Sequence, residues 1–425
     1  MERRKLEEFN EWWFTDKVPP ELLSQFRRNL YNKLTGRLEQ RQAIAITGLR
    51  RVGKTTLMYQ LIQRLLDSGV ESTDVLYFSF DEAVGNLSDV LETYREIYDK
   101  DFRKGRIYVF LDEAPRLSSW ADEVKKYYDL YPKIKFVVSG SESLFIRKGS
   151  RERLSGRIYE FFLPTLSFGE FLGLNGIGEV AKLSRLRLRQ FFVRYIEQGG
   201  FPEMALEKNL DEVRMYVRSS VIDKLIFRDL LALTGAKDVE LFMIMLEIFA
   251  TNPGMYVEYQ SLAQQFGRDR RIIRKYLMLL KEGFLVNLLA NFRKGKIASL
   301  RKLKRLYLAD TSIITAFHGS VDEMLFGKMV ENAVINALNA RFFWRNRHKV
   351  DAVVNGVPIE VKYQRKILPA DLKGVREFMR KFAVKNGIIV TKDEARRINL
   401  AEGRVRLIPA EDFLISPPVQ EVLGE

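Results

Sequence analysis

The sequence contains no cysteine and only two histidines, His318 and His348, among its 425 residues. The absence of cysteine excludes disulfide bonds, catalysis by a thiol and zinc sites built from cysteine. Two histidines are also too few for a histidine-rich metal cluster. We therefore interpret both histidines as structural rather than catalytic residues.

Long apolar segments are also missing. The first residues, Met1-Glu-Arg-Arg-Lys5, are charged, and no apolar segment of the kind found in secretory signals follows them. No apolar run approaches the roughly 20 residues that a membrane-spanning helix requires. The sequence therefore predicts a soluble, cytoplasmic protein that has no membrane segment.

Positive charge, in contrast, is abundant. The 70 Lys and Arg residues outnumber the 55 Asp and Glu residues, which gives a formal net charge of +15. Such a surplus attracts polyanions, so nucleic acid is the leading candidate partner and an anionic membrane surface is the second. The alternative is a charge-rich surface that has no ligand. With 46% hydrophobic residues, a chain of this length has enough apolar material for two to four domains.

Short apolar segments alternate with helical segments in the first third of the chain. Ala43–Thr47, Val75–Phe80, Ile107–Leu111 and Ile134–Ser139 are apolar and contain many Val, Ile and aromatic residues, whereas Thr56–Leu66 has helical periodicity. Continuous apolar strands separated by helices indicate a parallel sheet that is covered on both faces. We therefore predict an α/β fold here, then a helical region, and mixed α/β structure in the C-terminal part.

The most specific motif is Gly48-Leu-Arg-Arg-Val-Gly-Lys-Thr55, which fits the phosphate-loop pattern G-x-x-x-x-G-K-[ST] in full. It follows a predicted strand and opens a predicted helix, as the motif requires. Its glycines let backbone amides surround an anion, and the helix N-terminus adds a positive field. We expect Lys54 to reach the β- and γ-phosphates of ATP and Thr55 to contact Mg²⁺. The predicted nucleotide-binding residues here are Gly48, Arg50, Arg51, Val52, Gly53, Lys54, Thr55 and Thr56.

The expected partner of this loop is the acidic pair Asp112 and Glu113, which follows the apolar strand Ile107–Leu111. Side chains at the carboxyl end of a strand lie where α/β sheets bind ligands. We expect Asp112 to hold Mg²⁺ and Glu113 to orient or deprotonate the attacking water. The further strand Val75–Phe80 fits between the two motifs, an arrangement typical of P-loop enzymes with a glutamate beside the Mg²⁺ aspartate.

Two more polar residues are candidates for the same site. Ser139 ends the strand Ile134–Ser139 and could sense the γ-phosphate; a plain strand-to-loop turn is the alternative. Arg157, in Leu154-Ser-Gly-Arg157, could neutralise the charge of the transition state, either in cis or across a subunit. The alternative for Arg157 is an exposed structural arginine.

A second region has the spacing of a helix-turn-helix, with Ser261–Gly267 followed by Arg270–Leu280. A basic hairpin, Asn291–Arg305, follows the second helix. A basic recognition helix and a basic wing suit a DNA backbone, and the alternative is a protein-contact module with a solvated charged face. The predicted DNA contacts are Arg270, Arg271, Arg274, Lys275, Arg293, Lys294 and Lys296, and the hairpin also carries Arg301, Lys302, Lys304 and Arg305.

A third region predicts a β-hairpin, because Asn355-Gly356 separates two alternating runs. In that register Asp351 lies opposite Glu360, and Lys362 shares their face. Two opposed carboxylates repel each other, and a divalent cation or the ammonium group of Lys362 would relieve the repulsion. Glu331, on a predicted amphipathic helix, could complete a metal site. The D…E-x-K order is that of the PD-(D/E)XK nucleases; the alternatives are an inactive nuclease scaffold and a surface ion cluster.

In this order the motifs resemble those of archaeal and bacterial AAA-type, STAND-like P-loop ATPases with a C-terminal winged helix and a PD-(D/E)XK restriction-endonuclease-like domain. The resemblance covers nearly the full chain. It implies ATP hydrolysis with Mg²⁺, a helical lid, a winged helix, a nuclease-like tail and a homo-oligomer such as a hexamer. Besides the motifs above, the segments that carry it are Asn10-Glu-Trp-Trp13, Ser139-Gly-Ser141, Leu163–Phe171, Gly199-Gly-Phe-Pro-Glu203 and Arg228-Asp229.

We therefore expect an N-terminal helical extension, a P-loop ATPase core, a helical lid, a winged helix and a nuclease-like domain. Their expected bounds are residues 1–38, 39–172, 173–236, 237–312 and 313–425. The preferred function is an ATPase that acts on or near DNA and whose hydrolysis moves the basic C-terminal modules. The alternatives are a nucleotide-controlled protein-interaction switch with an inactive nuclease-like tail, and an ATP-regulated, Mg²⁺-dependent nuclease.

Overall fold

The chain forms two compact α/β units, which we call unit 1 (Met1–Pro164) and unit 2 (Thr165–Glu425). The division falls at Pro164, eight residues before the expected end of the ATPase core at residue 172. Unit 1 holds a five-stranded parallel sheet, and unit 2 holds a mixed nine-stranded sheet, counted over the residues that are described. The computed structural model describes residues 3–81, 85–140, 151–230, 238–293 and 303–417.

The sheet of unit 1 has the strand order β2-β3-β4-β1-β5, with every neighbouring pair parallel. Four of its strands are buried along their full length or nearly so, as expected for a sheet covered on both faces. The strand between β1 and β3 is β4, whereas Val75–Phe80, expected there, forms the edge strand β2. The strands are β1 (Ala43–Thr47), β2 (Val75–Ser79), β3 (Ile107–Asp112), β4 (Ile134–Gly140) and β5 (Ile158–Phe162).

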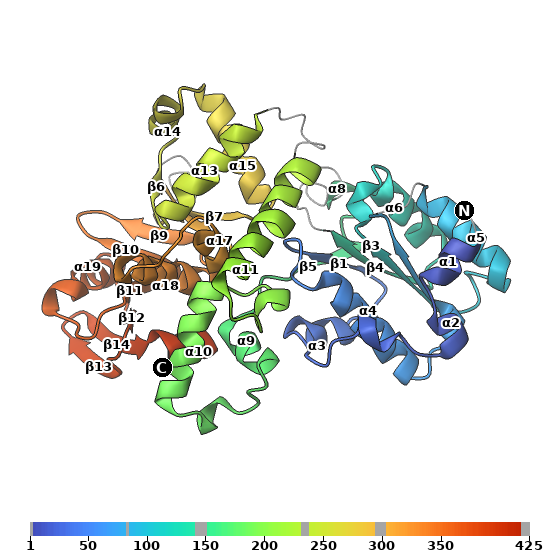
Figure 1. Ribbon diagram of the computed structural model, residues 1–425, viewed down its shortest axis with the longest axis horizontal. Helices are drawn as coiled ribbons and strands as arrows, with labels where there is room; N and C mark the ends of the chain where they lie inside the picture. The colour runs from blue at the N-terminus through green and yellow to red at the C-terminus, as the bar shows by residue number, and fades with distance from the viewer. Residues whose placement is uncertain (1–2, 82–84, 141–150, 231–237, 294–302, 418–425) are drawn as a thin grey trace. The chain divides into compact units, whose positions relative to one another are not determined.

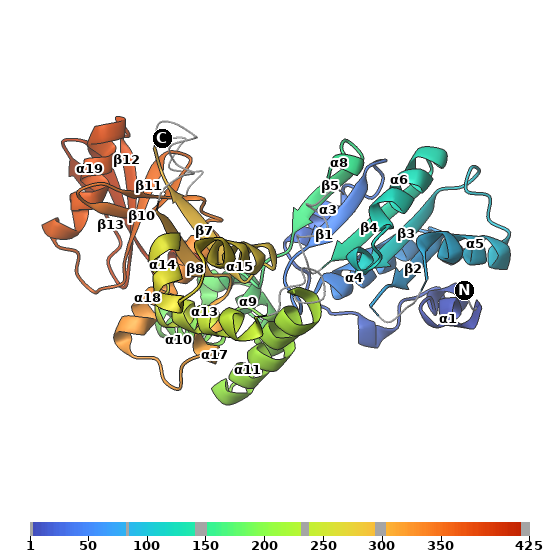
Figure 2. The same ribbon diagram turned by 90° about the horizontal axis from the view of Figure 1, so that it is seen from above.

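Helices cover both faces of this sheet. The connection from β1 to β2 contains α4 (Lys54–Asp67) and crosses the sheet toward the β2 edge. The connection from β3 to β4 contains α6 (Trp120–Leu130) and crosses the sheet in the opposite direction. Because parallel crossovers are right-handed, connections in opposite directions place their helices on opposite faces. Figure 2 shows α4 and α6 on the two sides of β4. The connection from β2 to β3 contains α5 (Leu87–Tyr98).

The N-terminal segment is part of unit 1 and covers the edge strand β2. Asn10 is fully buried; its Oδ1 accepts from the amide of Tyr77 at 2.6 Å, and its Nδ2 donates to the carbonyl of Tyr77 at 2.9 Å. The indoles of Trp12 and Trp13 both donate to the carbonyl of Val75, at 2.9 and 2.8 Å. These bonds satisfy backbone groups that an edge strand would leave unpaired. The segment contains α1 (Arg3–Glu8), α2 (Trp12–Thr15) and α3 (Leu30–Thr35).

Unit 2 begins with α9 (Phe168–Leu174), which was expected at the end of the ATPase core. The helices expected to form a lid follow it, and they are α10 (Arg185–Gln198), α11 (Leu210–Tyr216) and a π-helix over Val217–Leu230. The side chains of Arg228 and Asp229, which carry part of the family resemblance, lie outside the described part of the chain.

The middle of unit 2 has the element order expected of a winged helix. The described residues form three helices and three short strands in the order helix, strand, helix, helix, strand, strand, and β8 lies between β6 and β7 in an antiparallel sheet. The expected wing residues Lys294, Lys296, Arg301 and Lys302 lie outside the described residues. The elements are α13 (Val239–Thr251), β6 (Tyr256–Val257), α14 (Tyr259–Phe266), α15 (Arg270–Glu282), β7 (Val286–Asn291) and β8 (Lys304–Leu308).

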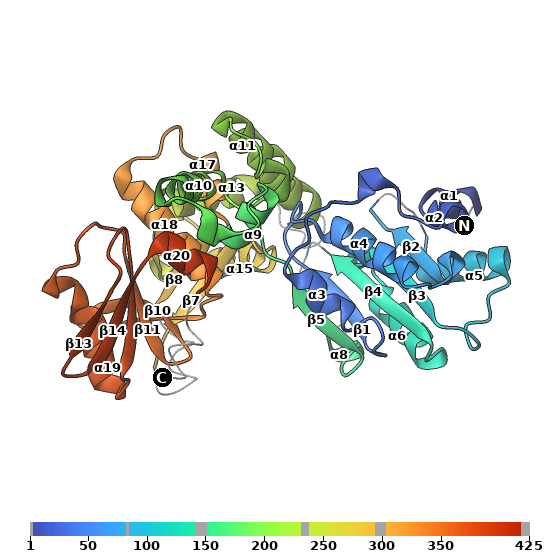
Figure 3. The ribbon, with the colours of Figure 1, turned by 90° about the horizontal axis from the view of Figure 1, so that it is seen from below.

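This small sheet continues into the C-terminal part without a break. The order is β13-β14-β12-β11-β10-β9-β7-β8-β6, and β7 pairs in parallel with β9 through Ala290 and Asn291. The domain boundary expected at residue 312 therefore does not divide unit 2 into two separate sheets. Figure 3 shows the C-terminal strands side by side, with α20 at the end of β14. The added elements are α17 (Thr311–Ala316), α18 (Glu323–Ala337), β9 (Phe342–Arg345), β10 (Lys349–Val354), β11 (Val357–Lys362), α19 (Lys373–Phe382), β12 (Asn386–Thr391), β13 (Arg396–Leu400), β14 (Gly403–Pro409) and α20 (Ala410–Ile415).

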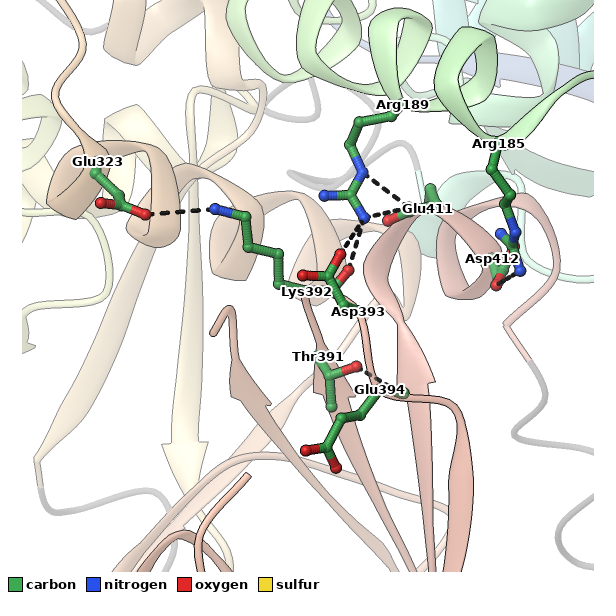
Figure 4. Close-up of polar contacts among 9 residues, drawn as sticks. All are labelled: Arg185, Arg189, Glu323, Thr391, Lys392, Asp393, Glu394, Glu411 and Asp412. Carbon is green, nitrogen blue, oxygen red and sulfur yellow. Dashed lines mark hydrogen bonds and ion pairs between the residues drawn. The ribbon is translucent and has the colours of Figure 1, made fainter. Parts of the chain in front are cut away.

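Ion pairs hold α10 to the C-terminal part of unit 2. Arg189 contacts Glu411 at 2.7 Å and Asp393 at 2.9 Å, and Arg185 contacts Asp412 at 2.5 Å (Figure 4). Glu411 is buried, so its pairing with Arg189 offsets the cost of removing a carboxylate from water. The predicted lid helices are thus integrated with the C-terminal sheet within unit 2 (Figure 1).

The Gly199-Gly200 pair ends α10 at a place where the backbone passes very close to its neighbours. A Cβ on Gly199, whose φ is +72°, would lie 1.9 Å from Oδ1 of Asp310. A Cβ on Gly200 would lie 2.5 Å from the carbonyl oxygen of Leu166. In return, Gly200 donates its amide to Asp310 at 3.0 Å and accepts from the amide of Leu166 at 2.7 Å. Only glycine fits both positions.

We predict that Gly199→Ala destabilises unit 2 strongly, because the new methyl group would displace the buried Asp310 carboxylate and the φ is unfavourable for alanine. The expected loss is about 2–4 kcal/mol of unfolding free energy, measured by urea denaturation. Gly178→Ala is the matched control, since a Cβ there meets no atom within 4 Å. Equal stability of the two variants would contradict this account of the glycine pair.

Candidate functional site

The phosphate loop, Gly48–Thr55, joins the buried strand β1 to the N-terminus of α4. Arg51 and Gly53 have left-handed backbone conformations, with φ of +65° and +91°. A Cβ on Gly48 would lie 2.2 Å from the carbonyl oxygen of Leu163, so the segment that follows β5 packs directly against the loop. These constraints shape a backbone turn at a helix N-terminus, which is a site for an anion.

Lys54 is folded back over this loop. Its side chain is 5% exposed, and Nζ donates to the carbonyls of Leu49 at 2.8 Å and Gly48 at 3.2 Å. Nζ also lies 3.9 Å from Oε1 of Glu113. The ammonium group therefore sits between the loop backbone and the carboxylate that was expected to activate water.

Asp112 is the acceptor for several donors at the end of β3. Its Oδ2 accepts from the hydroxyl of Thr55 at 2.6 Å and from the hydroxyl of Tyr77 at 3.0 Å. Its Oδ1 contacts the hydroxyl of Ser139 and accepts from the amide of Glu113 at 3.1 Å. Asp112 is 4% exposed, so these donors offset the cost of burying its charge.

Ser139 and Glu113 take their positions from the same contacts. Ser139 is fully buried at the end of β4, and its hydroxyl also lies 3.2 Å from the amide of Glu113. Glu113 has a left-handed φ of +47°, which ends β3 and directs the chain into the turn that follows. The structure thus brings together Lys54, Thr55, Asp112, Glu113 and Ser139, as the sequence predicted.

Comparison with known proteins identifies the type of domain that contains this phosphate loop. Residues 40–172 match a family described as an AAA domain. Unit 1 carries an AAA-type P-loop domain. Residues 189–323 match a second family, a domain of unknown function (DUF8612), which covers most of α10 and the winged-helix elements of unit 2.

Two curated relatives are described as uncharacterised proteins. A Haemophilus influenzae protein is 25% identical over 249 residues, which are 56% of this chain and 60% of that protein. The Methanocaldococcus jannaschii protein MJ1637 is 25% identical over 335 residues, which are 70% of this chain and 67% of that protein. The chain thus matches only about two thirds of the length of these relatives.

Solved structures to which the chain is similar include two Aeropyrum pernix proteins, ORC2 and ORC1. The ORC2 protein, solved with nucleotides, aligns with a TM-score of 0.45 at 14% identity, covering 76% of this chain and 96% of that one. The ORC1 protein in complex with DNA aligns with a TM-score of 0.35 at 11% identity, covering 72% and 96%.

Arg157 does not lie at the phosphate site of the AAA domain. Its carbonyl accepts from the amide of Ala43 at 2.7 Å, beside the start of β1, whereas the phosphate loop follows the end of β1 at Thr47. Its guanidinium forms two bonds to Asp129, at 2.8 and 3.1 Å, and these bonds lower the pKa of Asp129. The predicted role in cis is therefore wrong, because the length of strand β1 separates Arg157 from the loop. A role across a subunit stays a hypothesis.

Two contributors to the AAA site had no sequence signal that singled them out. Arg28 is buried and donates to the carbonyls of Val52 and Pro164, both at 2.8 Å, so it ties the phosphate loop to the end of unit 1. Tyr77 lies on the edge strand β2. Burial and the charge of Asp112 raise the pKa of Tyr77 well above 10, which keeps its hydroxyl a donor.

The predicted DNA contacts of α15 lie on its exposed side. Asp269 caps the helix by accepting from the amide of Arg271 at 2.6 Å, and the opposite face packs into the core through residues such as Leu277. Arg293, after β7, is also exposed. The exposed basic residues of the helix are Arg270, Arg271, Arg274 and Lys275.

The predicted hairpin is present. Asn355 and Gly356 have φ of +51° and +85°, as a type I′ turn requires, and Ala352 pairs with Ile359 in the expected register. Lys362 Nζ lies 3.2 Å from Oε1 of Glu360, as predicted.

A further cation was not expected at this hairpin. Arg305, predicted to belong to the basic wing, is buried and contacts Asp351 and Glu331, both at 2.7 Å. We call Glu331, Asp351 and Glu360, together with Arg305, Lys349 and Lys362, the carboxylate cluster.

Two features are absent from the described part of the chain, a membrane-spanning helix and a cluster of metal ligands. No helix among these residues is long and apolar enough to cross a membrane. Within the same residues, no group of three or more Asp, Glu or His side chains is arranged to hold a metal ion.

Burial and the nearby charge of Asp351 raise the pKa of Glu360 from 4.5 to about 8, against the opposing effect of Lys362 and Lys349. The folded protein therefore holds this proton more tightly than the unfolded chain, so stability falls as pH rises from 4.5 to about 8. We predict that Glu360→Gln flattens this part of the stability–pH curve, measured by urea denaturation. Glu8→Gln, at an exposed carboxylate, is the control. An unchanged slope in Glu360→Gln would contradict the prediction.

Proposed function

We propose that the chain is an ATPase that acts on or near DNA. The single observation that carries the ATPase part is the contact of Thr55 with Asp112, formed beside Lys54 in an AAA domain. A hydroxyl and a carboxylate oxygen at this distance are hard ligands, so the pair fits Mg²⁺ bound with the phosphates of ATP. When bound, Mg²⁺ would neutralise phosphate charge.

Lys54 and Glu113 supply the chemistry that follows from this arrangement. The ammonium group of Lys54 contacts loop carbonyls and lies near Glu113. Phosphate oxygens are stronger acceptors for an ammonium group than carbonyls are. We infer that nucleotide binding draws Lys54 away from Glu113, which leaves that carboxylate to orient or deprotonate water.

Support for action on DNA comes from charge and its placement. The chain has a net charge of +15, and α15 presents four exposed basic side chains in the second helix of a helix-turn-helix arrangement. Such a helix contacts phosphates without requiring specific bases. The alternative, a nucleotide-controlled protein-interaction switch, uses the same surface for an acidic protein partner. Assembly into a homo-oligomer such as a hexamer stays a proposal.

We predict that Lys54→Ala lowers ATP turnover by about 100-fold or more, because it removes the cation that meets the phosphates. Glu113→Gln should keep nucleotide binding and lose turnover, since the amide cannot accept the proton of water. Phosphate release and binding of a fluorescent ATP analogue measure the two effects. Arg64→Ala, an exposed charge on the same helix, is the control. Full turnover in both site variants would remove the proposed function.

A combined replacement of Arg270, Arg271, Arg274 and Lys275 by Ala tests the DNA part. It should weaken duplex binding and reduce the slope of log affinity against log salt by about 1 for each phosphate that the helix no longer neutralises. Fluorescence anisotropy across a salt series measures both quantities. The matched control removes four exposed charges from α19, through Lys373, Arg376, Arg380 and Lys381. Equal effects of the two variants would mean that net charge alone attracts DNA; no binding by the parent would favour the protein-partner alternative.

A further inference from the structure

Arg305 lies at the centre of the carboxylate cluster although it comes from strand β8 of the winged-helix segment. Its Nε donates to the carbonyl of Gly254 at 2.9 Å, Nη1 donates to Asp351 at 2.7 Å, and Nη2 donates to Glu331 at 2.7 Å. The whole residue is 4% exposed. One guanidinium therefore connects β8, β10, α18 and the turn that precedes β6.

The surroundings of this guanidinium are built to hold it. Tyr307 donates its hydroxyl to the same oxygen of Glu331 at 2.7 Å, and the rings of Tyr256 and Tyr307 lie 5.5 and 5.2 Å from the Arg305 carbon Cζ. Gly254 has a φ of +78°, and a Cβ there would approach both Arg305 and Glu331 to 3.0 Å. An arginine with its planar fork fits this enclosure, whereas a lysine would reach only one of its acceptors.

The cluster does not fit the metal that a PD-(D/E)XK arrangement implies. Both oxygens of Asp351 already accept hydrogen bonds, Oδ1 from Arg305 and Oδ2 from the amide of Val361 at 2.9 Å. Oε1 of Glu331 accepts from Arg305, and Oε1 of Glu360 contacts Lys362. In the described part of the chain, the buried carboxylate oxygen of this cluster that lacks a partner is Oε2 of Glu360. Mg²⁺ needs about six oxygen ligands around it.

We propose that Arg305 takes the position of a cation in the carboxylate cluster, and that the cluster is a fastening between the winged-helix strand β8 and the C-terminal hairpin rather than a metal centre. The contacts support this assignment, because each of the three carboxyl groups lies within 3.3 Å of a basic side chain, Arg305, Lys349 or Lys362. The arrangement is complete without an added ion.

The basic wing and the tail then have different roles from those expected of them. Arg305 is a buried residue of unit 2 rather than an exposed residue of the basic wing, and the winged-helix segment and the tail form one body within unit 2. Any movement driven by the nucleotide would displace this body as a whole. The cluster lies within unit 2, so its fastening role does not depend on ATP hydrolysis by unit 1.

Mn²⁺ binding to the nucleotide-free full chain, followed by electron paramagnetic resonance, tests whether the cluster takes a metal. The unaltered protein and Asp351→Asn should give the same binding isotherm up to millimolar Mn²⁺, because neither holds an ion at the cluster. A site present in the unaltered protein and absent in Asp351→Asn would overturn the proposal. Any site at the phosphate loop is common to both proteins and cancels in the comparison.

A double-mutant cycle tests the fastening itself. Arg305→Met should lower the midpoint of thermal unfolding of unit 2 by about 10 °C, because it removes the buried cation from the buried Asp351 carboxylate and leaves only the more exposed ammonium of Lys349. Adding Asp351→Asn should cost less than the sum of the two single changes, since the buried carboxylate charge is then gone.

Additive effects in this cycle would overturn the proposal. Arg345→Met is the control, because this exposed arginine lies 4.5 Å from the same Tyr256 ring and belongs to strand β9 rather than to the cluster. If Arg305→Met does not fold, Arg305→Lys replaces it in the cycle; a Lys variant as stable as the parent would also contradict the need for the guanidinium fork.

Discussion

A carboxylate removed from water has to be compensated, and this requirement organises both units. Asp112 in unit 1 and Asp351 in unit 2 are 4% and 0% exposed. Asp112 is surrounded by neutral donors from Thr55, Tyr77 and the backbone, so a cation can still be added beside it. Asp351 is compensated by a cation of the chain itself. The first arrangement suits a reversible ligand, and the second suits permanent structure.

In unit 1 the phosphate loop is connected to the point where the unit ends. The carbonyl of Thr47 accepts from the amide of Leu163 at 2.7 Å, and Arg28 holds the carbonyls of Val52 and Pro164 together. A change in the backbone of the phosphate loop on nucleotide binding would therefore also displace Pro164.

Local pattern predicted the features that depend on neighbours in the chain. The phosphate loop, the strands β1 to β4 of unit 1, the acidic pair after β3 and the Asn355-Gly356 turn all follow from spacing and turn chemistry, whereas β5 was not predicted. Strand order did not, because the position of β4 between β1 and β3 depends on pairing between distant segments. Arg305 was interpreted as a wing residue for the same reason. Its neighbours in sequence are basic, and its carboxylate partners are 26 and 46 residues away.

We infer that the chain has one site that can bind a cation, beside Thr55 and Asp112. At the second site, the carboxylate cluster, Arg305 takes the position of the cation. Crystals grown with Mn²⁺ and a non-hydrolysable ATP analogue test this most directly, through the anomalous scattering of Mn²⁺. The predicted result is a peak beside Thr55 and Asp112, with Arg305 still bound to Asp351. A peak between Asp351 and Glu360, or none beside Asp112 with the analogue bound, would contradict this inference.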